Sequence, residues 1–384
     1  MKLRWRRWSA FLVAALLTTG LLTPAAAGGR SGSGHGNGMI AFAAPDSVSD
    51  SGAWVARSDG SSARSLGLGL ASYRLAWSPD GRWLVIQALQ KEVEVMRPVI
   101  VRPDGRDART LRPAGLSTQT DVAPCIWTPT GLQLVCQVIS FATGDHSQDG
   151  LWMIDARDGR HARRLTTNPY PPAEDFGGGD IPGGVSPDGR WIVFTRARQD
   201  LTNPEKQTGA LFLIGTNGKG LRQLTAYGVA NSHDDALSSF SPDGRVILFG
   251  GADGSILTIR PDGRGLSQVK IRGTKGSAYV RSPSWSPDGT RIVFTAQLPR
   301  SVDEDEDKPA PIVIDRLLFK SDDGGYLRAE RSHLFLLRVA DGAVTPLTDG
   351  PYDELQPAWS PDGTQIAFVS KRGEEPDAHD NWDL

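Results

Sequence analysis

Residues 284–295 read SWSPDGTRIVFT, and this order of an apolar residue, a Ser-Pro-Asp-Gly turn and an apolar strand recurs along the chain. The copies lie at 76–87, 126–137, 184–195, 239–250, 284–295 and 358–369, with their turn tetrapeptides at 78–81, 128–131, 186–189, 241–244, 286–289 and 360–363. The residues before the turns are 50, 58, 55, 45 and 74 positions apart. A sequence period of about fifty residues predicts propeller blades or a related array.

The tetrapeptide itself predicts a tight turn between two antiparallel strands. Proline presets φ, aspartate folds its side chain back onto the backbone, and glycine takes the left-handed position. Segments 150–166, 210–225, 255–270 and 333–348 each add an apolar alternating strand, an Asp-Gly or Asn-Gly turn and a short outer strand. Two such hairpins make one four-stranded blade, so we predict an all-β propeller of six to seven blades over residues 39–384.

The two ends of the repeat region leave the blade count open. Residues 39–66 supply the second to fourth strands of a blade that lacks its first strand, and residues 358–369 open another blade. In one alternative the C-terminal strands close the ring against the N-terminal blade. In the other, the chain is the front portion of a longer protein and its last blade is unfinished.

The first 27 residues predict an export signal. Four basic residues, Lys2, Arg4, Arg6 and Arg7, precede a short apolar run that ends in small residues at Ala25 and Ala27. We expect cleavage after Ala27, a flexible linker over 28–38, no membrane span in the mature protein, and a periplasmic or extracellular location in a bacterium. An uncleaved anchor is the alternative, and the sequence does not choose between the general and the twin-arginine export routes.

The composition narrows the class of partner. The 384 residues include 42 basic and 44 acidic residues, a net charge of −2, so no electrostatic footprint for nucleic acid is present. The 44 glycines, 26 prolines and 11 tryptophans are typical of an all-β protein with many turns and aromatic packing. We therefore expect a protein or peptide partner and no nucleic acid.

The repeats resemble those of TolB-type propellers, the SPDG-bearing (PD40) relatives of WD40 repeats. Residues 315–342 and the PLTDGPYDELQPAWSPDG segment that follows look more like the propeller of the prolyl oligopeptidase and acylaminoacyl-peptidase family. That second resemblance implies a hydrolase domain with a nucleophilic serine in G-x-S-x-G, an aspartate and a histidine. The chain contains no G-x-S-x-G, and it has no room before residue 39 for the small α/β domain of TolB. We therefore assign no catalytic residue, no cofactor and no metal ligand.

The candidate site residues are acids in the connections that run from an outer strand to the next inner strand, toward the channel of a propeller. They are Asp121, Asp180, Asp234, Asp235, Asp353 and Glu354. Such a partial ring would attract a cationic peptide segment or hold a divalent cation. The alternative is that these acids cap turns and solvate loops. Segments 166–184, a contact loop or lid, and 301–309, a solvated acidic loop, are further candidates.

Two further sets of residues are predicted to be structural. Cys125 and Cys136 flank one turn at positions that face each other across a hairpin, so an exported protein can join them in a disulfide that contributes about 2 to 3 kcal/mol. Two buried thiols are the alternative. The aromatic residues before the turns are predicted to pack between neighbouring blades, and they are Trp77, Trp127, Phe240, Trp285 and Trp359.

Three functions are consistent with these features. The first, which we favour, is an exported propeller that binds a protein or peptide and has no chemistry of its own. The second is the substrate-gating propeller of a serine peptidase. The third is a propeller enzyme that acts at its channel, such as a lyase or a glycosidase, and the acids support it only through their positions.

Overall fold

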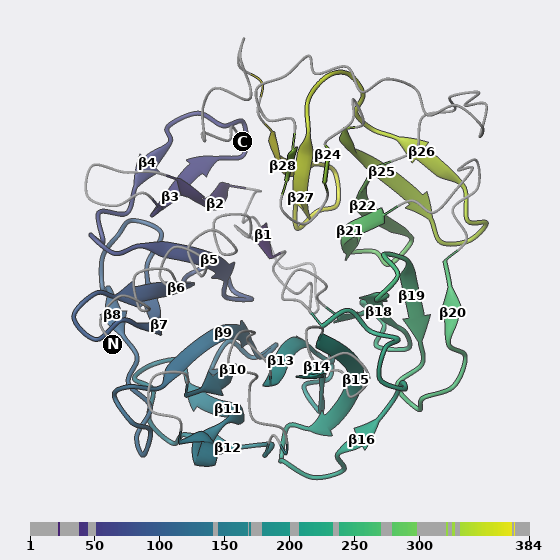
Figure 1. Ribbon diagram of the computed structural model, residues 1–384. Helices are drawn as coiled ribbons and strands as arrows, with labels where there is room; N and C mark the ends of the chain where they lie inside the picture. The colour runs from purple at the N-terminus through teal and green to yellow at the C-terminus, as the bar shows by residue number, and fades with distance from the viewer. Residues whose placement is uncertain are drawn as a thin grey trace.

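The structure is a computed structural model, and it describes residues 22–23, 38–44, 51–140, 145–167, 169, 179–199, 207–232, 238–269, 279–297, 320–321, 325–326, 331–370 and 372. These residues form small sheets that follow one another around a ring (Figure 1). Within this part of the chain the one helical element is the single 3-10 turn η1 (His146–Gln148), and no helix is long and apolar enough to cross a membrane. The predicted all-β propeller is confirmed.

Five blades contain four antiparallel strands joined in sequence order. They are β5 (Ser72–Trp77), β6 (Leu84–Gln90), β7 (Val95–Val101) and β8 (Arg109–Thr110); β9 (Asp121–Trp127), β10 (Gln133–Ile139), β11 (Gly150–Asp155) and β12 (Arg163–Arg164); β13 (Gly179–Val185), β14 (Trp191–Gln199), β15 (Gln207–Gly215) and β16 (Arg222–Gln223); β17 (Ser239–Phe240), β18 (Ile247–Gly250), β19 (Ile256–Ile259) and β20 (Ser267–Gln268); and β21 (Tyr279–Trp285), β22 (Arg291–Gln297), β25 (Ser332–Arg338) and β26 (Val344–Pro346). We name each blade by its first and last strand.

Strands from both ends of the chain occupy the arc between the last complete blade and the first (Figure 1). The N-terminal sheet contains β2 (Met39–Ala44), β3 (Gly52–Arg57) and β4 (Arg64–Ser65), and the C-terminal sheet contains β27 (Glu354–Trp359) and β28 (Ile366–Ser370). The short β1 (Leu22–Thr23) pairs in parallel with β5, and β23 (Lys320–Ser321) pairs with β24 (Gly325–Tyr326) inside the long interval of the fifth blade. The rest of the predicted signal peptide 1–27 and of the linker 28–38 lies outside the described residues, apart from Gly38.

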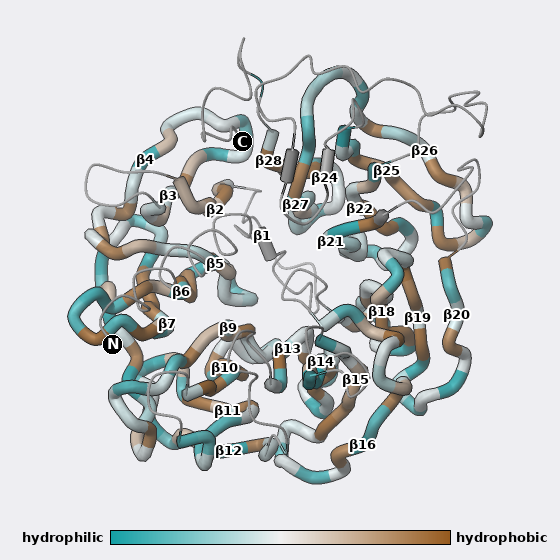
Figure 2. The backbone as a smooth tube through the Cα atoms, in the orientation of Figure 1, coloured by the Kyte–Doolittle hydropathy of each residue, from teal (hydrophilic) through white to brown (hydrophobic). Residues whose placement is uncertain are grey.

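The cores lie between adjacent sheets. The described residues form six hydrophobic clusters, one at each contact from β2–β4 around to β27–β28. Figure 2 shows hydrophobic residues along the middle strands and hydrophilic residues at many of the turns. A closed ring of six blades has six interfaces between sheets. In this six-bladed propeller, β27–β28 and β2–β4 share the sixth position. Among the described strands, no ladder joins β28 to β2.

The Ser-Pro-Asp-Gly turns have the predicted chemistry. In five of them the serine hydroxyl donates to the aspartate Oδ1 over 2.5 to 2.7 Å, and the backbone N–H two residues after the aspartate donates to the same oxygen in those turns. The serine hydrogen bond is the first cause that lowers the pKa of Asp188, Asp243 and Asp288. The glycines have φ between +67° and +73°, the left-handed region that glycine adopts without steric cost. The repeated motif is therefore a fold element.

A second repeated contact joins neighbouring blades, and the sequence analysis did not predict it. The short outer strand of four sheets carries an arginine whose guanidinium donates to a backbone carbonyl in the outer turn of the next blade. The pairs are Arg64 with Pro103 (2.6 Å), Arg109 with Arg157 (2.5 Å), Arg163 with Thr216 (2.7 Å) and Arg222 with Pro261 (2.7 Å). A leucine two residues later is buried in the same interface. We call this the outer-strand Arg-x-Leu pair.

Candidate functional site: the loop face

Buried charged side chains gather at one end of the blades. This end, which we call the loop face, carries the connections from outer to inner strands and from second to third strands, and it is opposite to the Ser-Pro-Asp-Gly turns. The four predicted acids that the structure describes, Asp121, Asp180, Asp353 and Glu354, lie here because they are at the start of inner strands or directly precede them. Each one that the structure describes has partners within the chain.

Asp180 forms the most buried of these ion pairs. It is 0% exposed, and Arg196, its partner across the β13–β14 ladder, donates from Nε to Oδ1 over 2.6 Å and from Nη2 to Oδ2 over 2.7 Å. The guanidinium also lies over the Phe212 ring at 4.9 Å. The hydroxyl of Thr166, from the outer end of the preceding blade, donates to Oδ2 and accepts from the Leu151 N–H. The acid therefore joins two blades.

Glu354 repeats this arrangement at the start of β27. It is 0% exposed, and its Oε2 is hydrogen-bonded to His333 Nδ1 at 2.8 Å and to the Thr348 hydroxyl at 3.0 Å. Arg372 donates to Oε1 over 2.9 Å. The neighbouring Asp353 pairs with Arg331 and accepts from the Ser332 N–H. Both acids thus fix the end of β25 against β27.

Asp121 differs from the other acids because no arginine of the described residues donates to it. Its Oδ1 accepts from the Met96 N–H of the preceding blade over 2.7 Å. Burial raises the pKa of Asp121 to about 6, and the Met96 hydrogen bond and the charge of Arg97 oppose this rise. Burial also lowers the pKa of Arg97.

Arginine and glutamine side chains fix the loops of this face. Arg97 donates to the carbonyls of Thr118 over 2.8 Å and of Ser117 over 3.2 Å, within the connection to β9. Gln148 then links this connection to the next blade, because its Nε2 donates to the Gly115 carbonyl over 2.6 Å and its Oε1 accepts from the Ser117 N–H over 3.1 Å. Two loops from adjacent blades are thereby held in one arrangement.

The predicted partial ring of acids is not a set of free carboxylates in the described part of the chain. Asp121, Asp180, Asp353 and Glu354 each lie beside their own partners, and Asp234 and Asp235 lie outside the described residues, as do segment 301–309 and most of 166–184. Among residues with a described position, no three or more His, Cys, Asp or Glu side chains are placed to hold one metal ion.

The predicted structural residues lie in the blades. Cys125 and Cys136 are opposite in the β9–β10 ladder and are bonded to each other, with a Cα–Cα distance of 4.1 Å. Trp127 donates its indole N–H to the Ala76 carbonyl of the preceding blade, and Trp359 donates to that of Ser284. Phe240 is buried between blades, while Trp77 and Trp285 are partly buried against such clusters.

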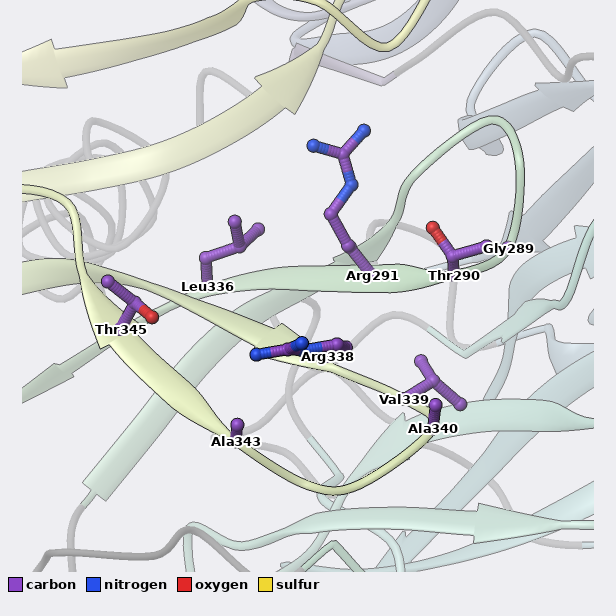
Figure 3. A pocket seen from close by; sticks show the side chains of 9 residues that line it. All are labelled: Gly289, Thr290, Arg291, Leu336, Arg338, Val339, Ala340, Ala343 and Thr345. Atoms are coloured by element: carbon purple, nitrogen blue, oxygen red, sulfur yellow. The ribbon is translucent and has the colours of Figure 1, made fainter.

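A separate pocket lies on the side of the fifth blade, away from the loop face (Figure 3). Its volume is about 530 Å³, and side chains from β22, β25 and β26 line it. They include Arg291, Leu336, Arg338 and Thr345, and Thr290 lines the pocket from the turn before β22. Arg291 lies over the Trp359 ring and donates to the Gly363 carbonyl, so one side of the pocket belongs to the contact with β27–β28.

Comparison with known proteins gives distant relatives, and no family model matches the sequence. The uncharacterized peptidase YuxL of Bacillus subtilis (strain 168) is 28% identical over 251 residues, which cover 62% of this chain and 28% of that protein. The chain therefore spans less than a third of the length of this relative.

Two solved structures also show similarity to the chain. A TolB candidate from Agrobacterium tumefaciens is 18% identical, with a TM-score of 0.49, over 80% of this chain and 93% of that one. An oligogalacturonate lyase in complex with manganese is 13% identical, with a TM-score of 0.47, over 86% and 93%. The names of these proteins include a TolB candidate and a peptidase, the two groups that the repeats resemble. The fold of the described residues is a β-propeller.

Proposed function

We propose that the protein is an exported propeller that binds a protein or peptide partner through its loop face and has no chemistry of its own. The observation that carries the proposal is the link between two loops of adjacent blades by Arg97 and Gln148. Loops that are already ordered lose less conformational freedom when a partner binds, so such a surface favours affinity.

The state of the acids supports a binding role over catalysis at these positions. A general acid or base must exchange a proton with a substrate, whereas Asp180 and Glu354 are fully buried and hydrogen-bonded to basic side chains of the same chain. The near-neutral composition favours a polypeptide over a nucleic acid as the partner. The proposal requires no cofactor.

A displayed library of random peptides, selected on the protein with residues 1–27 removed, tests this proposal. We expect selected peptides to bind with measurable affinity in calorimetry, and Gln148→Ala to weaken them about tenfold because the two loops separate, a change of about 1.4 kcal/mol. Gln365→Ala, an exposed substitution at the opposite end of the blades, is the matched control. Equal weakening by both variants, or no selected peptide, would contradict the loop face as the binding surface.

A second candidate function is the propeller portion of a longer serine peptidase. The similarity to a peptidase-named protein over 251 residues favours it. The intact mass of the protein from its native source, with the DNA that follows codon 384, distinguishes the two functions. A mass equal to residues 28–384 supports the binding propeller and the predicted export cleavage. A mass larger by a hydrolase domain, with G-x-S-x-G encoded downstream, supports the peptidase.

A further inference from the structure

The charge of the protein is unevenly distributed between the two ends of its blades. The end opposite to the loop face, which we call the turn end, carries the Ser-Pro-Asp-Gly turns and the six outer turns, each of which leads into a short outer strand. The outer turns contain 13 basic and 7 acidic residues, although the whole chain contains 42 and 44. They are residues 57–64, 102–109, 155–163, 215–222, 260–266 and 338–344.

The Ser-Pro-Asp-Gly turns at the same end are close to neutral. Each counted with the two residues that follow it, these six turns add 4 basic and 5 acidic residues. The excess of basic charge therefore belongs to the outer turns, at the rim of the ring. The near-neutral net charge of the chain conceals this basic rim.

The outer-strand Arg-x-Leu contacts make the basic residues of the rim continuous from blade to blade. Arg163 donates to the turn that contains Lys219, and Arg222 donates to the turn that contains Arg260 and Arg264. Lys219, Arg260 and Arg264 are exposed. The basic side chains thus follow one another along the outer rim, past β8, β12, β16 and β20 (Figure 1), and we call them the basic belt.

The acids of the outer turns have a local role in turn geometry. In four of these turns an aspartate Oδ1 accepts the backbone N–H two residues later over 2.9 Å. The four are Asp59, Asp104, Asp158 and Asp262. Two further acids of these turns also have partners, because Asp107 accepts from Arg102 over 2.6 Å and Asp155 is hydrogen-bonded to His161 at 2.7 Å. The turns therefore need their acids, and the excess of basic charge remains at the surface.

Exposed apolar side chains are concentrated at the same end. Among the described residues seven large hydrophobic side chains are exposed, and five of them lie at the turn end. Leu132, in the turn between β9 and β10, is the most exposed of the seven. The five are Met39, Leu132, Leu221, Leu266 and Val339, exposed by 39%, 71%, 47%, 48% and 43%. Apolar tips beside basic side chains are typical of surfaces that bind at a membrane interface.

We propose that the turn end docks on the surface of an anionic phospholipid bilayer. The turns lie around one end of a ring, so their tips can reach a flat surface together. Lipid phosphates attract the basic belt, and Leu132, Leu221 and Leu266 insert their side chains between the headgroups. Binding of this kind adds burial of apolar area to electrostatic attraction.

A docked turn end leaves the loop face on the side away from the lipid. The loop face would then remain accessible to a partner of its own. The two proposals use opposite ends of the blades, so either can fail without the other.

Sedimentation of the protein with lipid vesicles tests this proposal. Residues 1–27 are removed so that the apolar run of the predicted signal does not itself bind lipid. Vesicles of phosphatidylcholine alone are compared with vesicles of equal parts phosphatidylcholine and phosphatidylglycerol, an anionic lipid. We expect the protein to sediment with the anionic vesicles only, and to be released as the salt concentration rises, because salt screens exposed charges.

Matched charge variants locate the contact on the molecule. Lys219→Glu combined with Arg264→Glu should weaken binding about thirtyfold or more, since each basic residue near an anionic surface contributes about fivefold. Lys91→Glu combined with Arg112→Glu changes the net charge equally in exposed connections of the loop face, and it should leave binding nearly unchanged. Urea unfolding of both double variants checks that they are folded.

A second pair of variants tests the insertion of apolar side chains. Leu132→Asn should weaken binding to anionic vesicles about tenfold, because it removes the most exposed apolar side chain of the turn end. Val93→Asn, at a valine that is 37% exposed on the loop face, is the matched control and should have no effect.

Several results would overturn the proposal. Equal sedimentation with neutral and anionic vesicles, or none with either, would do so. Equal weakening by the two charge variants would show that the turn end is not the contact, and unchanged binding of Leu132→Asn would show that no apolar side chain inserts there. Binding to soluble dextran sulfate without binding to anionic vesicles would assign the basic belt to an acidic polymer instead of a lipid surface.

Discussion

Asp180 and Glu354 occupy similar positions at the start of inner strands, yet their basic partners differ in burial. Both acids are 0% exposed, and both bind the hydroxyl of a threonine from the outer end of the preceding blade. Arg196, the partner of Asp180, has a side chain that is 6% exposed, whereas the side chain of Arg372, a partner of Glu354, is 47% exposed. The acid at this position thus forms a core ion pair in blade β13–β16 and a half-solvated ion pair at β27–β28.

The largest predicted effect comes from breaking the interior ion pair, Asp180 with Arg196. Arg196→Met should lower the free energy of unfolding by about 3 to 5 kcal/mol, because it leaves the Asp180 carboxylate buried without its cation. Arg372→Met should cost less than about 1 kcal/mol, since solvent screens that pair and His333 still binds Glu354. Urea unfolding of both variants measures the difference. Restoration of stability in the double variant Asp180→Asn with Arg196→Met would confirm the cause, and equal costs for Arg196→Met and Arg372→Met would refute the comparison.

The disulfide of blade β9–β12 is a second stabilising feature of an interior blade that β27–β28 lacks. Replacing Cys125 and Cys136 together by alanine should lower stability by about 2 to 3 kcal/mol, because the bond closes a short loop and restricts the unfolded chain. Thermal unfolding with and without a reductant measures this effect. The double variant should be insensitive to the reductant, whereas a reductant that destabilises it equally would show that the bond contributes nothing.

The pH dependence of Asp121 extends the comparison, because Asp121 is a partly buried acid to which no arginine of the described residues donates. Its pKa is raised to about 6 in the folded protein, against 3.8 for the ordinary group, so the folded state holds this proton more tightly than the unfolded chain. Its contribution to stability is therefore fully present below about pH 4 and is lost as the pH rises through about 6. The stability of the native protein minus that of Asp121→Asn should fall by about 1 to 3 kcal/mol between these pH values. A difference that stays level, or rises, would show that Asp121 is charged throughout.

The sequence predicted the repeated elements well and their charged contacts poorly, for a physical reason. Turn chemistry and strand alternation are local, so the Ser-Pro-Asp-Gly turns and the opposed positions of Cys125 and Cys136 could be read from spacing. Arg196 joins Asp180 across a ladder, and Thr166 reaches the same acid from another blade. Such contacts depend on the stagger between sheets, which no local pattern encodes. The threonines that follow the outer-strand leucines can be seen in the sequence, but the groups that their hydroxyls bind cannot.

The last prediction separates the two members of the Arg-x-Leu pair, of which the arginine has the smaller expected effect. Arg163→Ala should cost less than about 1 kcal/mol, because its hydrogen bond to the Thr216 carbonyl lies at the exposed rim. Leu165→Ala should cost about 2 to 4 kcal/mol, because that side chain is 7% exposed in the core between blades. At the fifth blade Leu347→Ala should cost less than about 1 kcal/mol, because its side chain is already 43% exposed. If unfolding in urea gave Leu165→Ala and Leu347→Ala the same cost, the last outer strand would be covered in solution as the interior ones are.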